Sequence, residues 1–267
     1  MYKVLISVLS FFISSFFYFN YNFKLKTRID LEIEPIIFRT DNLGFIYVSD
    51  NILLRKYNLN GELIKTYSDD KFLDLQLVDA TDPFKILLYY KNSNKIIFLD
   101  KNLAKIGNEI SLDKLNYFAV KSVCKSKQYA IWIFDEFENK LIQYCFNPNR
   151  IIHQISMDNF TTGDVSISEQ GNYVAVISNK SSVYIFNDNG LFIDSLNLKG
   201  KNIFQIKGEN IIYNEEKNVY SYNFIKKETK SFKFDKINDF EELRIENDNL
   251  YVTKGKSIFI YSMNLKE

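Results

Sequence analysis

The sequence has few of the residue types on which many enzyme sites depend. Its 267 residues include one histidine and two cysteines. A zinc-type cluster cannot be assembled from one histidine and two separated cysteines, and a Ser-His-Asp or Cys-His site would have to use His153. The glycine patterns of P-loops and dinucleotide-binding folds are absent as well. These absences argue against several large classes of enzyme.

The chain also lacks an excess of charge of either sign. Lysine and arginine total 34 and aspartate and glutamate total 33, and the two kinds are interspersed along the chain. A nucleic-acid binder usually shows a basic patch or stripe, so the sequence predicts no nucleic-acid partner. The hydrophobic fraction of 46% and charged fraction of 25% are typical of a folded globular chain.

The N-terminus contains the one long apolar run, from Val4 to Phe19, which follows Lys3 and is interrupted only by serines. This is the shape of a signal peptide, and the run is short for a membrane span of about 20 residues. No A-x-A-like cleavage site follows, so an uncleaved membrane anchor is one alternative, and a plain buried first strand is another. Three basic residues just after the run, Lys24, Lys26 and Arg28, oppose an anchor with its N-terminus inside.

From this segment we expect residues 1–23 to be a signal peptide or N-terminal membrane anchor, with a membrane tether if it is retained. Residues 24–267 are expected to form a single domain, because one all-β propeller can use that length. The protein is then exported, to the periplasm or to the outer membrane.

Apolar β-type runs recur six times at nearly constant spacing. Taking Tyr47, Leu88, Trp132, Ala175, Ile212 and Tyr251 as equivalent positions gives steps of 41, 44, 43, 37 and 39 residues. One such run precedes each of these runs, and two follow it in the first five repeats. A full repeat therefore contains four short strands. This period and strand number are typical of a propeller blade. The sequence therefore predicts an all-β fold, a six-bladed β-propeller with four-stranded blades.

Two details of the repeats bear on their turns and on ring closure. Asn60-Gly61 and Asn189-Gly190 are predicted to be the turns between third and fourth strands, where residues must tolerate positive φ. The sixth repeat ends after its third strand, and the segment Lys24 to Ile33 can supply the missing outer strand. We expect an N-terminal strand to complete the last blade, because an open blade would expose an unpaired edge.

The strand triplets of the repeats resemble the NHL and YWTD group of six-bladed propellers. More specifically, "DATDPFKILLYYKNSNKIIFLDKNLAKIGNEISLDKL", from Asp79 to Leu115, is similar to an uncharacterised propeller family of the Bacteroidota cell envelope. The resemblance covers most of Asp41 to Ile260. It implies the propeller fold and an envelope location, and it brings no established activity or catalytic residue to this chain.

The third repeat contains both cysteines, the histidine and the single tryptophan. Cys124 falls on the innermost strand and Cys145 on the third strand, so one strand lies between them. Two strand spacings are about 10 Å, beyond the roughly 7 Å Cα limit for a disulfide, and we expect two buried free thiols. His153 falls on the outer strand, where an ordinary surface or edge residue is expected, and Trp132 is expected in the core.

An enzyme is kept as the alternative function. Six-bladed propellers include calcium-dependent lactonases, whose metal lies in the axial channel. Glu34 and Asp164 enter the inner strands of the first and fourth repeats, so both could point into such a channel. Calcium takes about six to eight oxygen ligands, and the equivalent positions of the other repeats are apolar or lysine. We therefore predict no cofactor and no metal, with a metal-dependent hydrolase as the alternative.

Loop length favours a binding or scaffold module over an enzyme. With the strands of a blade named A (inner) to D (outer), the D-to-A and B-to-C connections emerge on one face, and these carry the longer loops. Binding residues concentrate on such loops, and aromatic anchors dominate binding energy. We predict that this face contacts an envelope protein through Phe137, Phe160, Phe240, Asp69, Asp113 and Lys114. Packing of the three phenylalanines against the blade ends is the alternative.

Overall fold

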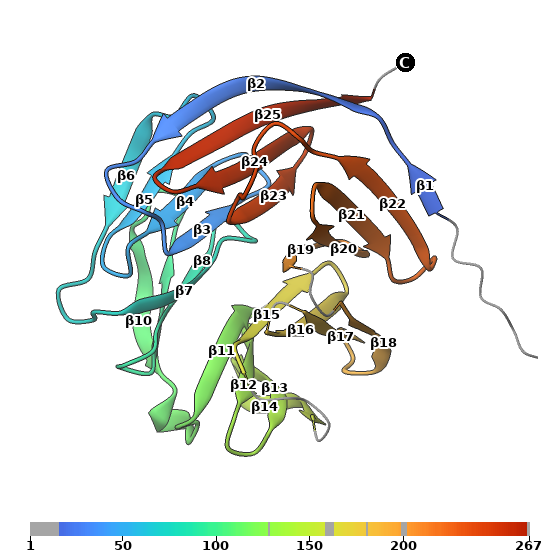
Figure 1. The fold of residues 1–267 in the computed structure, drawn as a ribbon. Helices are drawn as coiled ribbons and strands as arrows, with labels where there is room; N and C mark the ends of the chain where they lie inside the picture. Colours follow the sequence, from blue (N-terminus) through green and yellow to red (C-terminus); the bar gives the residue numbers. More distant parts are fainter. Residues whose placement is uncertain (1–15, 128, 158–162, 180, 199–201, 266–267) are drawn as a thin grey trace, which may run out of the picture.

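The computed structural model describes residues 16–127, 129–157, 163–179, 181–198 and 202–265. Their strands form six sheets arranged around a central axis (Figure 1), antiparallel apart from one added strand, which confirms the six-bladed propeller. A 3-10 helix, Asp113–Leu115, precedes blade 3. In the described residues no helix is long and apolar enough to cross a membrane.

Four blades follow the chain without interruption. Blade 1 contains β3 (Ile37–Thr40), β4 (Ile46–Ser49), β5 (Leu54–Tyr57) and β6 (Leu63–Tyr67), and blade 2 contains β7 (Leu75–Asp79), β8 (Ile86–Tyr90), β9 (Lys95–Leu99) and β10 (Lys105–Ser111). Blade 3 contains β11 (Val120–Lys125), β12 (Ala130–Asp135), β13 (Lys140–Phe146) and β14 (Asn149–Ser156), and blade 4 contains β15 (Val165–Gln170), β16 (Tyr173–Ser178), β17 (Ser182–Asn187) and β18 (Phe192–Asn197).

The last two blades combine both ends of the chain. Blade 5 contains β19 (Asn202–Lys207), β20 (Asn210–Glu215), β21 (Asn218–Asn223) and β22 (Glu228–Lys233), with β1 (Phe16–Tyr18) added beside β22. Blade 6 contains β23 (Glu242–Glu246), β24 (Asn249–Lys254), β25 (Ser257–Leu265) and, as its outer strand, β2 (Tyr21–Asp30).

The hydrophobic core lies between the blades. Each of six clusters of buried side chains joins two neighbouring blades, and the inner strands contact one another in sequence around the ring, from β3 to β23 and back to β3. Both faces of a blade are therefore covered, and all five residues of β8 are buried. A strand buried on both faces reads as a continuous apolar run, which explains why the second strand of each repeat is so clear in the sequence.

The ring is closed by the N-terminal strand, as predicted. Strand β2 pairs antiparallel with β25 from Tyr21 opposite Leu265 to Asp30 opposite Ser257. Phe23 is buried, and its ring lies 5.6 Å from that of Phe232 and 5.1 Å from that of Phe234. Figure 1 shows β2 running along the outer rim beside β25 and leading back to β1 at blade 5.

The pairing of β1 was not expected from the sequence. It adds to blade 5 as a fifth, parallel strand, with Phe16 opposite Thr229 and Tyr18 opposite Ser231. The N-terminal segment thus joins blades 5 and 6 to each other. Whether residues 1–23 are a signal peptide or an anchor stays a prediction, and residues 1–15 lie outside the described part of the chain.

The two Asn-Gly turns join third to fourth strands, as predicted. Gly61 has φ of 85° and Gly190 has φ of 76°, a region that favours glycine. The side chains of Asn58 and Asn187 each accept two backbone N–H groups of their own turn. Residues 41–45 and 100–104 repeat this pattern with an aspartate as the acceptor. In the described residues this five-residue turn therefore occurs four times, at two sites more than the Asn-Gly pairs indicate.

Backbone hydrogen bonds separate the connections into two faces. The D-to-A connections bond the B-to-C turns: the Met157 N–H donates to the Asn139 carbonyl at 2.9 Å, and the Glu136 N–H to the Ala119 carbonyl at 2.8 Å. We call this side the crossover face. The A-to-B and C-to-D turns bond each other on the opposite side, the turn face, as when the Asp188 N–H donates to the Asn172 carbonyl at 2.8 Å.

The residues of blade 3 lie as the sequence predicts. Cys124 and Cys145 are buried and unpaired, and burial raises the pKa of the Cys124 thiol, which disfavours the reactive thiolate. Trp132 is fully buried. His153 lies on the outer strand β14, where its ring stacks against Trp132 with centroids 6.5 Å apart.

Candidate functional site

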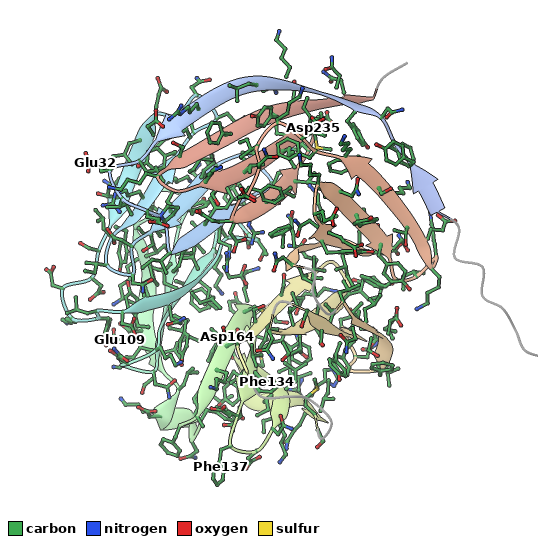
Figure 2. The ribbon with its side chains drawn as sticks, in the orientation of Figure 1. Glu32, Glu109, Phe134, Phe137, Asp164 and Asp235 are labelled. Carbon is green, nitrogen blue, oxygen red and sulfur yellow. The ribbon has the colours of Figure 1, made fainter. Side chains whose placement is uncertain are left out.

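Phe137 is the most exposed large apolar residue in the described part of the chain, at 89%. It occupies the B-to-C turn of blade 3, and Figure 2 shows it pointing outward at the periphery of the ring. The turn is held by its neighbours, because the Glu138 N–H donates to Asp135 Oδ1 at 2.9 Å and Glu136 forms an ion pair with Lys121 at 2.9 Å. An aromatic ring is therefore presented to solvent from a fixed loop.

Phe118 is the second most exposed residue of this kind, at 72%, and sequence reasoning did not single it out. It lies in the D-to-A connection that enters blade 3. Its neighbour Ala119 accepts the backbone hydrogen bond from Glu136, the neighbour of Phe137. Two exposed phenylalanines thus belong to two loops that are bonded to each other.

Three further exposed apolar side chains lie in the crossover-face loops of blades 1 and 2. We define the apolar arc as Ile36, Ile52, Leu73, Phe118 and Phe137, all at least 59% exposed. They lie in the D-to-A connections and B-to-C turns of blades 1 to 3. The turn face also exposes apolar residues, such as Phe84 at 60%, but in the described residues none matches the two phenylalanines of the arc.

The structure gives the other predicted contact residues different surroundings. Phe240 is half-buried and packs against Phe204 and Phe234, with ring centroids 5.7 and 6.0 Å away, so the alternative of packing describes it. Phe160 lies outside the described residues. The exposed Asp113 and Lys114 belong to the same D-to-A connection as Phe118.

Asp69 lies on the crossover face, at the start of the connection from blade 1 to blade 2. It accepts a hydrogen bond from the Tyr67 hydroxyl at 3.1 Å and another from the Lys71 N–H at 2.9 Å. It is half-buried. These bonds shape the loop that presents Leu73, so Asp69 supports the apolar arc locally.

A concave site lies on the axis of the ring, apart from the apolar arc. A cavity of about 340 Å³ is lined by inner strands and A-to-B turns of blades 1, 2, 4, 5 and 6. Its rim includes the exposed turn residues Asn42, Thr81 and Asn247, which places its opening on the turn face.

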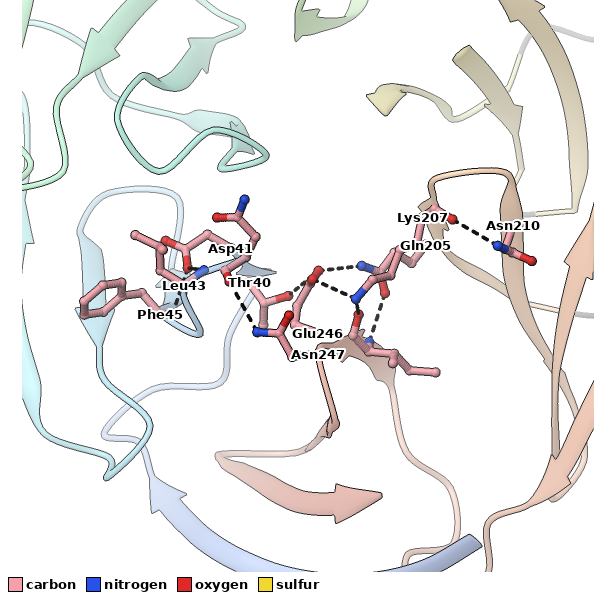
Figure 3. Close-up of polar contacts among 11 residues, drawn as sticks. Thr40, Asp41, Leu43, Phe45, Gln205, Lys207, Asn210, Glu246 and Asn247 are labelled. Atoms are coloured by element: carbon pink, nitrogen blue, oxygen red, sulfur yellow. Dashed lines mark hydrogen bonds and ion pairs between the residues drawn. The ribbon is translucent and has the colours of Figure 1, made fainter. Parts of the chain in front are cut away.

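Polar side chains from three blades meet at the mouth of this cavity (Figure 3). Glu246 of blade 6 accepts hydrogen bonds from Gln205 Nε2 at 2.7 Å and from Lys207 Nζ at 3.0 Å, both in blade 5. In blade 1, Asp41 accepts a hydrogen bond from the Tyr47 hydroxyl at 2.8 Å. Burial raises the pKa of Asp41 despite this bond. These contacts join blades 5 and 6 at the cavity mouth, and the Thr40 hydroxyl of blade 1 donates to Glu246 Oε1 at 3.4 Å.

The residues of the hydrolase alternative do not line this cavity. Glu34 and Asp164 are exposed, and both precede their inner strands on the crossover side. Figure 2 shows Asp164 toward the inner edge of blade 4. No group of three or more His, Cys, Asp or Glu side chains suited to a metal occurs in the described residues.

Solved structures similar to this chain are β-propellers from very different proteins. A catalytically inactive virginiamycin B lyase of Staphylococcus aureus with quinupristin has a TM-score of 0.61 at 11% identity, over 90% of this chain and 99% of that one. The β-propeller domain of Cps50 (Swd1) of Myceliophteria thermophila has a TM-score of 0.61 at 9% identity, over 91% and 100%. The Pan2 WD40 domain of Neurospora crassa has a TM-score of 0.58 at 6% identity, over 92% and 96%.

At these identities the likeness shows the fold alone. No protein-family model matches the sequence, and no curated protein matches it. The chain is therefore a six-bladed β-propeller that resembles both a lyase and WD40 domains in fold.

Proposed function

We propose that this chain is a non-enzymatic binding or scaffold module of a bacterial cell envelope, which engages a partner protein through the apolar arc. The observation that carries the proposal is the exposure of Phe118 and Phe137 on two hydrogen-bonded loops. The fold itself does not decide between binding and catalysis, because similar propellers include WD40 domains and a lyase.

The geometry of the two phenylalanines suits a binding anchor. Aromatic side chains dominate the energy of many interfaces, and they bind best when little conformational freedom is lost. The Glu136–Ala119 hydrogen bond and the Lys121–Glu136 ion pair already order the two loops. Burying both rings against a partner would remove a large apolar area from water at small entropic cost.

The surroundings of the rings resemble the rim of a protein interface. Asp113 and Lys114 lie on the same connection as Phe118, and Glu138 pairs with Lys140 at 2.6 Å beside Phe137. Apolar anchors ringed by charged groups are typical of such interfaces. A protein surface with a pocket for aromatic rings and polar groups around it is the expected partner.

The envelope location rests on the N-terminal apolar run and on the resemblance to a Bacteroidota propeller family. The sequence places the end of this segment at residue 23, but β2 starts at Tyr21 and Phe23 is buried in the core, so any cleavage of the run as a signal peptide is expected before Tyr21. Mass spectrometry of the purified protein gives the mature N-terminus. A mature chain that starts at residue 24 would contradict this expectation.

The partner proposal is tested by capture from envelope extracts of the producing bacterium. The native chain is compared with Phe118→Ala, Phe137→Ala and the control Phe84→Ala, an equally apolar change at a 60% exposed site on the turn face. We expect one stoichiometric protein whose recovery falls about fivefold or more in the first two variants, a loss of ~1 kcal/mol. Phe84→Ala should retain it.

Equal recovery of the same proteins by all four chains would overturn the proposal. All four are expected to melt at nearly the same temperature, since exposed positions contribute little to stability. A lower melting temperature of Phe118→Ala or Phe137→Ala would indicate that the rings pack against their own blades.

A further inference from the structure

Two arginines from the first and the last repeat meet in the axial cavity. Arg39 of β3 lies opposite Tyr47 in blade 1, and Arg244 of β23 lies opposite Tyr251 in blade 6. The two tyrosines occupy equivalent positions of the repeat, so the two arginines are equivalent as well. They become neighbours only because the ring closes, and both line the cavity.

Both guanidinium groups contact one carbonyl oxygen. Arg39 Nη1 donates to the Phe38 carbonyl at 2.7 Å, and Arg244 Nε donates to the same oxygen at 3.4 Å. The two nitrogens are therefore at most about 6 Å apart, the sum of those distances. Two like charges that meet in a half-buried cavity repel each other, and a bound anion would relieve that repulsion.

Two of the carboxylates near the pair are bonded to other groups. Asp79 accepts hydrogen bonds from Thr81 and from the Lys125 N–H, and Glu246 is bonded to Gln205 and Lys207. In the described residues neither arginine forms an ion pair within 4.0 Å. Burial and, second, the charge of Arg39 lower the pKa of Arg244 to about 10, although Glu242, Glu246 and Asp79 act in the opposite direction.

We propose that the axial cavity binds a small organic monocarboxylate, with its carboxylate between Arg39 and Arg244. Guanidinium groups match carboxylates in shape and bind them through paired N–H donors. The cavity of about 340 Å³ is in the size range of small-ligand sites. This site is separate from the partner surface, because it opens on the turn face.

The remaining lining selects the rest of the ligand. Apolar side chains of blades 4 and 5 line the cavity, and Ile167, Ile177 and Ile203 among them are buried, so an apolar ligand body fits there. The ionisable lining residues are three cations (Arg39, Lys207, Arg244) and four carboxylates (Asp41, Asp79, Glu242, Glu246). With carboxylates in excess, a singly charged carboxylate is favoured over a phosphate dianion.

The test uses hexanoate, hexanol and inorganic phosphate as probes of the full chain, by calorimetry in a buffer without carboxylate or phosphate. We expect hexanoate to bind the native chain about tenfold or more tightly than either hexanol or phosphate. Tighter binding of phosphate would overturn the monocarboxylate, and equal binding of hexanol would overturn the arginine site. No binding of hexanoate at millimolar concentration would overturn the proposal as a whole.

Three variants locate the binding. Arg39→Met and Arg244→Met should each weaken hexanoate about tenfold or more. Arg28→Met, at an exposed arginine paired with Asp30 on the outer strand, should leave binding unchanged. Without ligand, the first two variants should melt at or above the native temperature, because one of two repelling charges is gone. If both variants still bind hexanoate as the native chain does, the assignment to Arg39 and Arg244 is wrong. If the variants do not fold, binding of the three probes to the native chain tests the proposal.

Discussion

The crossover face and the turn face join the same strands by different means, and this decides what each face can do. On the turn face, four connections are five-residue turns in which an Asn or Asp side chain accepts two backbone N–H groups. On the crossover face, the connections after Tyr67 and Ser111 are longer and expose Leu73 and Phe118. Substitutions in the longer loops cost little folding stability. The crossover face can therefore carry a partner site, while the turn face frames the cavity.

The strongest test of this comparison removes the N-terminal strands β1 and β2, which close the ring that carries both faces. A chain that begins at Leu31 lacks β1 and β2, and therefore the pairing with β25 and the buried Phe23 and Ile29. We expect a loss on the order of 5 kcal/mol in the free energy of unfolding, together with loss of partner capture and of hexanoate binding. Urea denaturation measures the stability.

The control for this truncation begins at Asn20 and lacks only β1. Three residue pairs with β22 are then lost, and about 1 kcal/mol is expected. If the chain that begins at Leu31 melted within a degree or two of the native protein, closure by the N-terminal strand would be wrong.

The next test contrasts two phenylalanines of the crossover face. Phe240→Ala removes a ring that packs against Phe204 and Phe234, so a loss of ~2 kcal/mol in stability is expected. Phe137→Ala removes a ring that is 89% exposed, and a change of less than about 0.5 kcal/mol is expected. Thermal and urea unfolding of both variants gives the comparison. Equal losses would mean that the exposed ring is as structural as the packed one.

The sequence predicts the fold well because the central strands of a blade are buried on both sides, which leaves an apolar run in every repeat. The central strands such as β8 and β12 are buried along their whole length, so their apolar runs give the period directly. The N-terminal strand was predictable because the sixth repeat visibly lacks its fourth strand. Strand β1 was not, since its parallel pairing with β22 joins residues more than 200 positions apart and leaves no local pattern.

The sites are predicted less well, because exposure depends on loop geometry. Tyr117 and Phe118 are adjacent in one connection, yet Tyr117 joins the hydrophobic cluster between blades 2 and 3 while Phe118 is 72% exposed. Nothing in their order in the sequence tells which ring is buried. Arg39 and Arg244 could have been found by aligning the first and sixth repeats, but their proximity follows only from the closed ring.

A smaller effect is expected from the turns of the turn face. Asn187→Ala leaves the N–H groups of Asn189 and Leu191 without their side-chain acceptor, and a loss of ~1 kcal/mol in stability is expected. Lys114→Ala, at an exposed site of the crossover face, should cost less than about 0.5 kcal/mol. Urea unfolding of the two variants measures the difference. A neutral Asn187→Ala would mean that the side chain does not hold the turn.

The smallest effect concerns pH, and it acts through a half-buried carboxyl between blades 3 and 4 on the turn side. Glu169 accepts hydrogen bonds from the Ser126 hydroxyl and from Trp132 Nε1, yet burial raises its pKa above the ordinary 4.5. The protonated form is therefore favoured in the folded state. Its stabilising contribution is present below pH 4.5 and is lost as the pH rises through the folded pKa.

Glu169→Gln removes this titration. As the pH rises from 4 to 7, the free energy of unfolding of the native chain should therefore fall relative to that of the variant, by less than the stability lost in Asn187→Ala. Glu109→Gln is the matched control on the exposed strand β10. The backbone N–H of Glu109 itself, and then Lys105, lower the pKa of that carboxyl, so its contribution is lost as the pH falls and its drift should have the opposite sign. Melting curves of the three chains from about pH 3 to pH 7 measure both drifts, because the contribution of Glu109 is lost below about pH 4.5. Parallel curves for the native chain and Glu169→Gln would show that burial of Glu169 does not favour its protonated form.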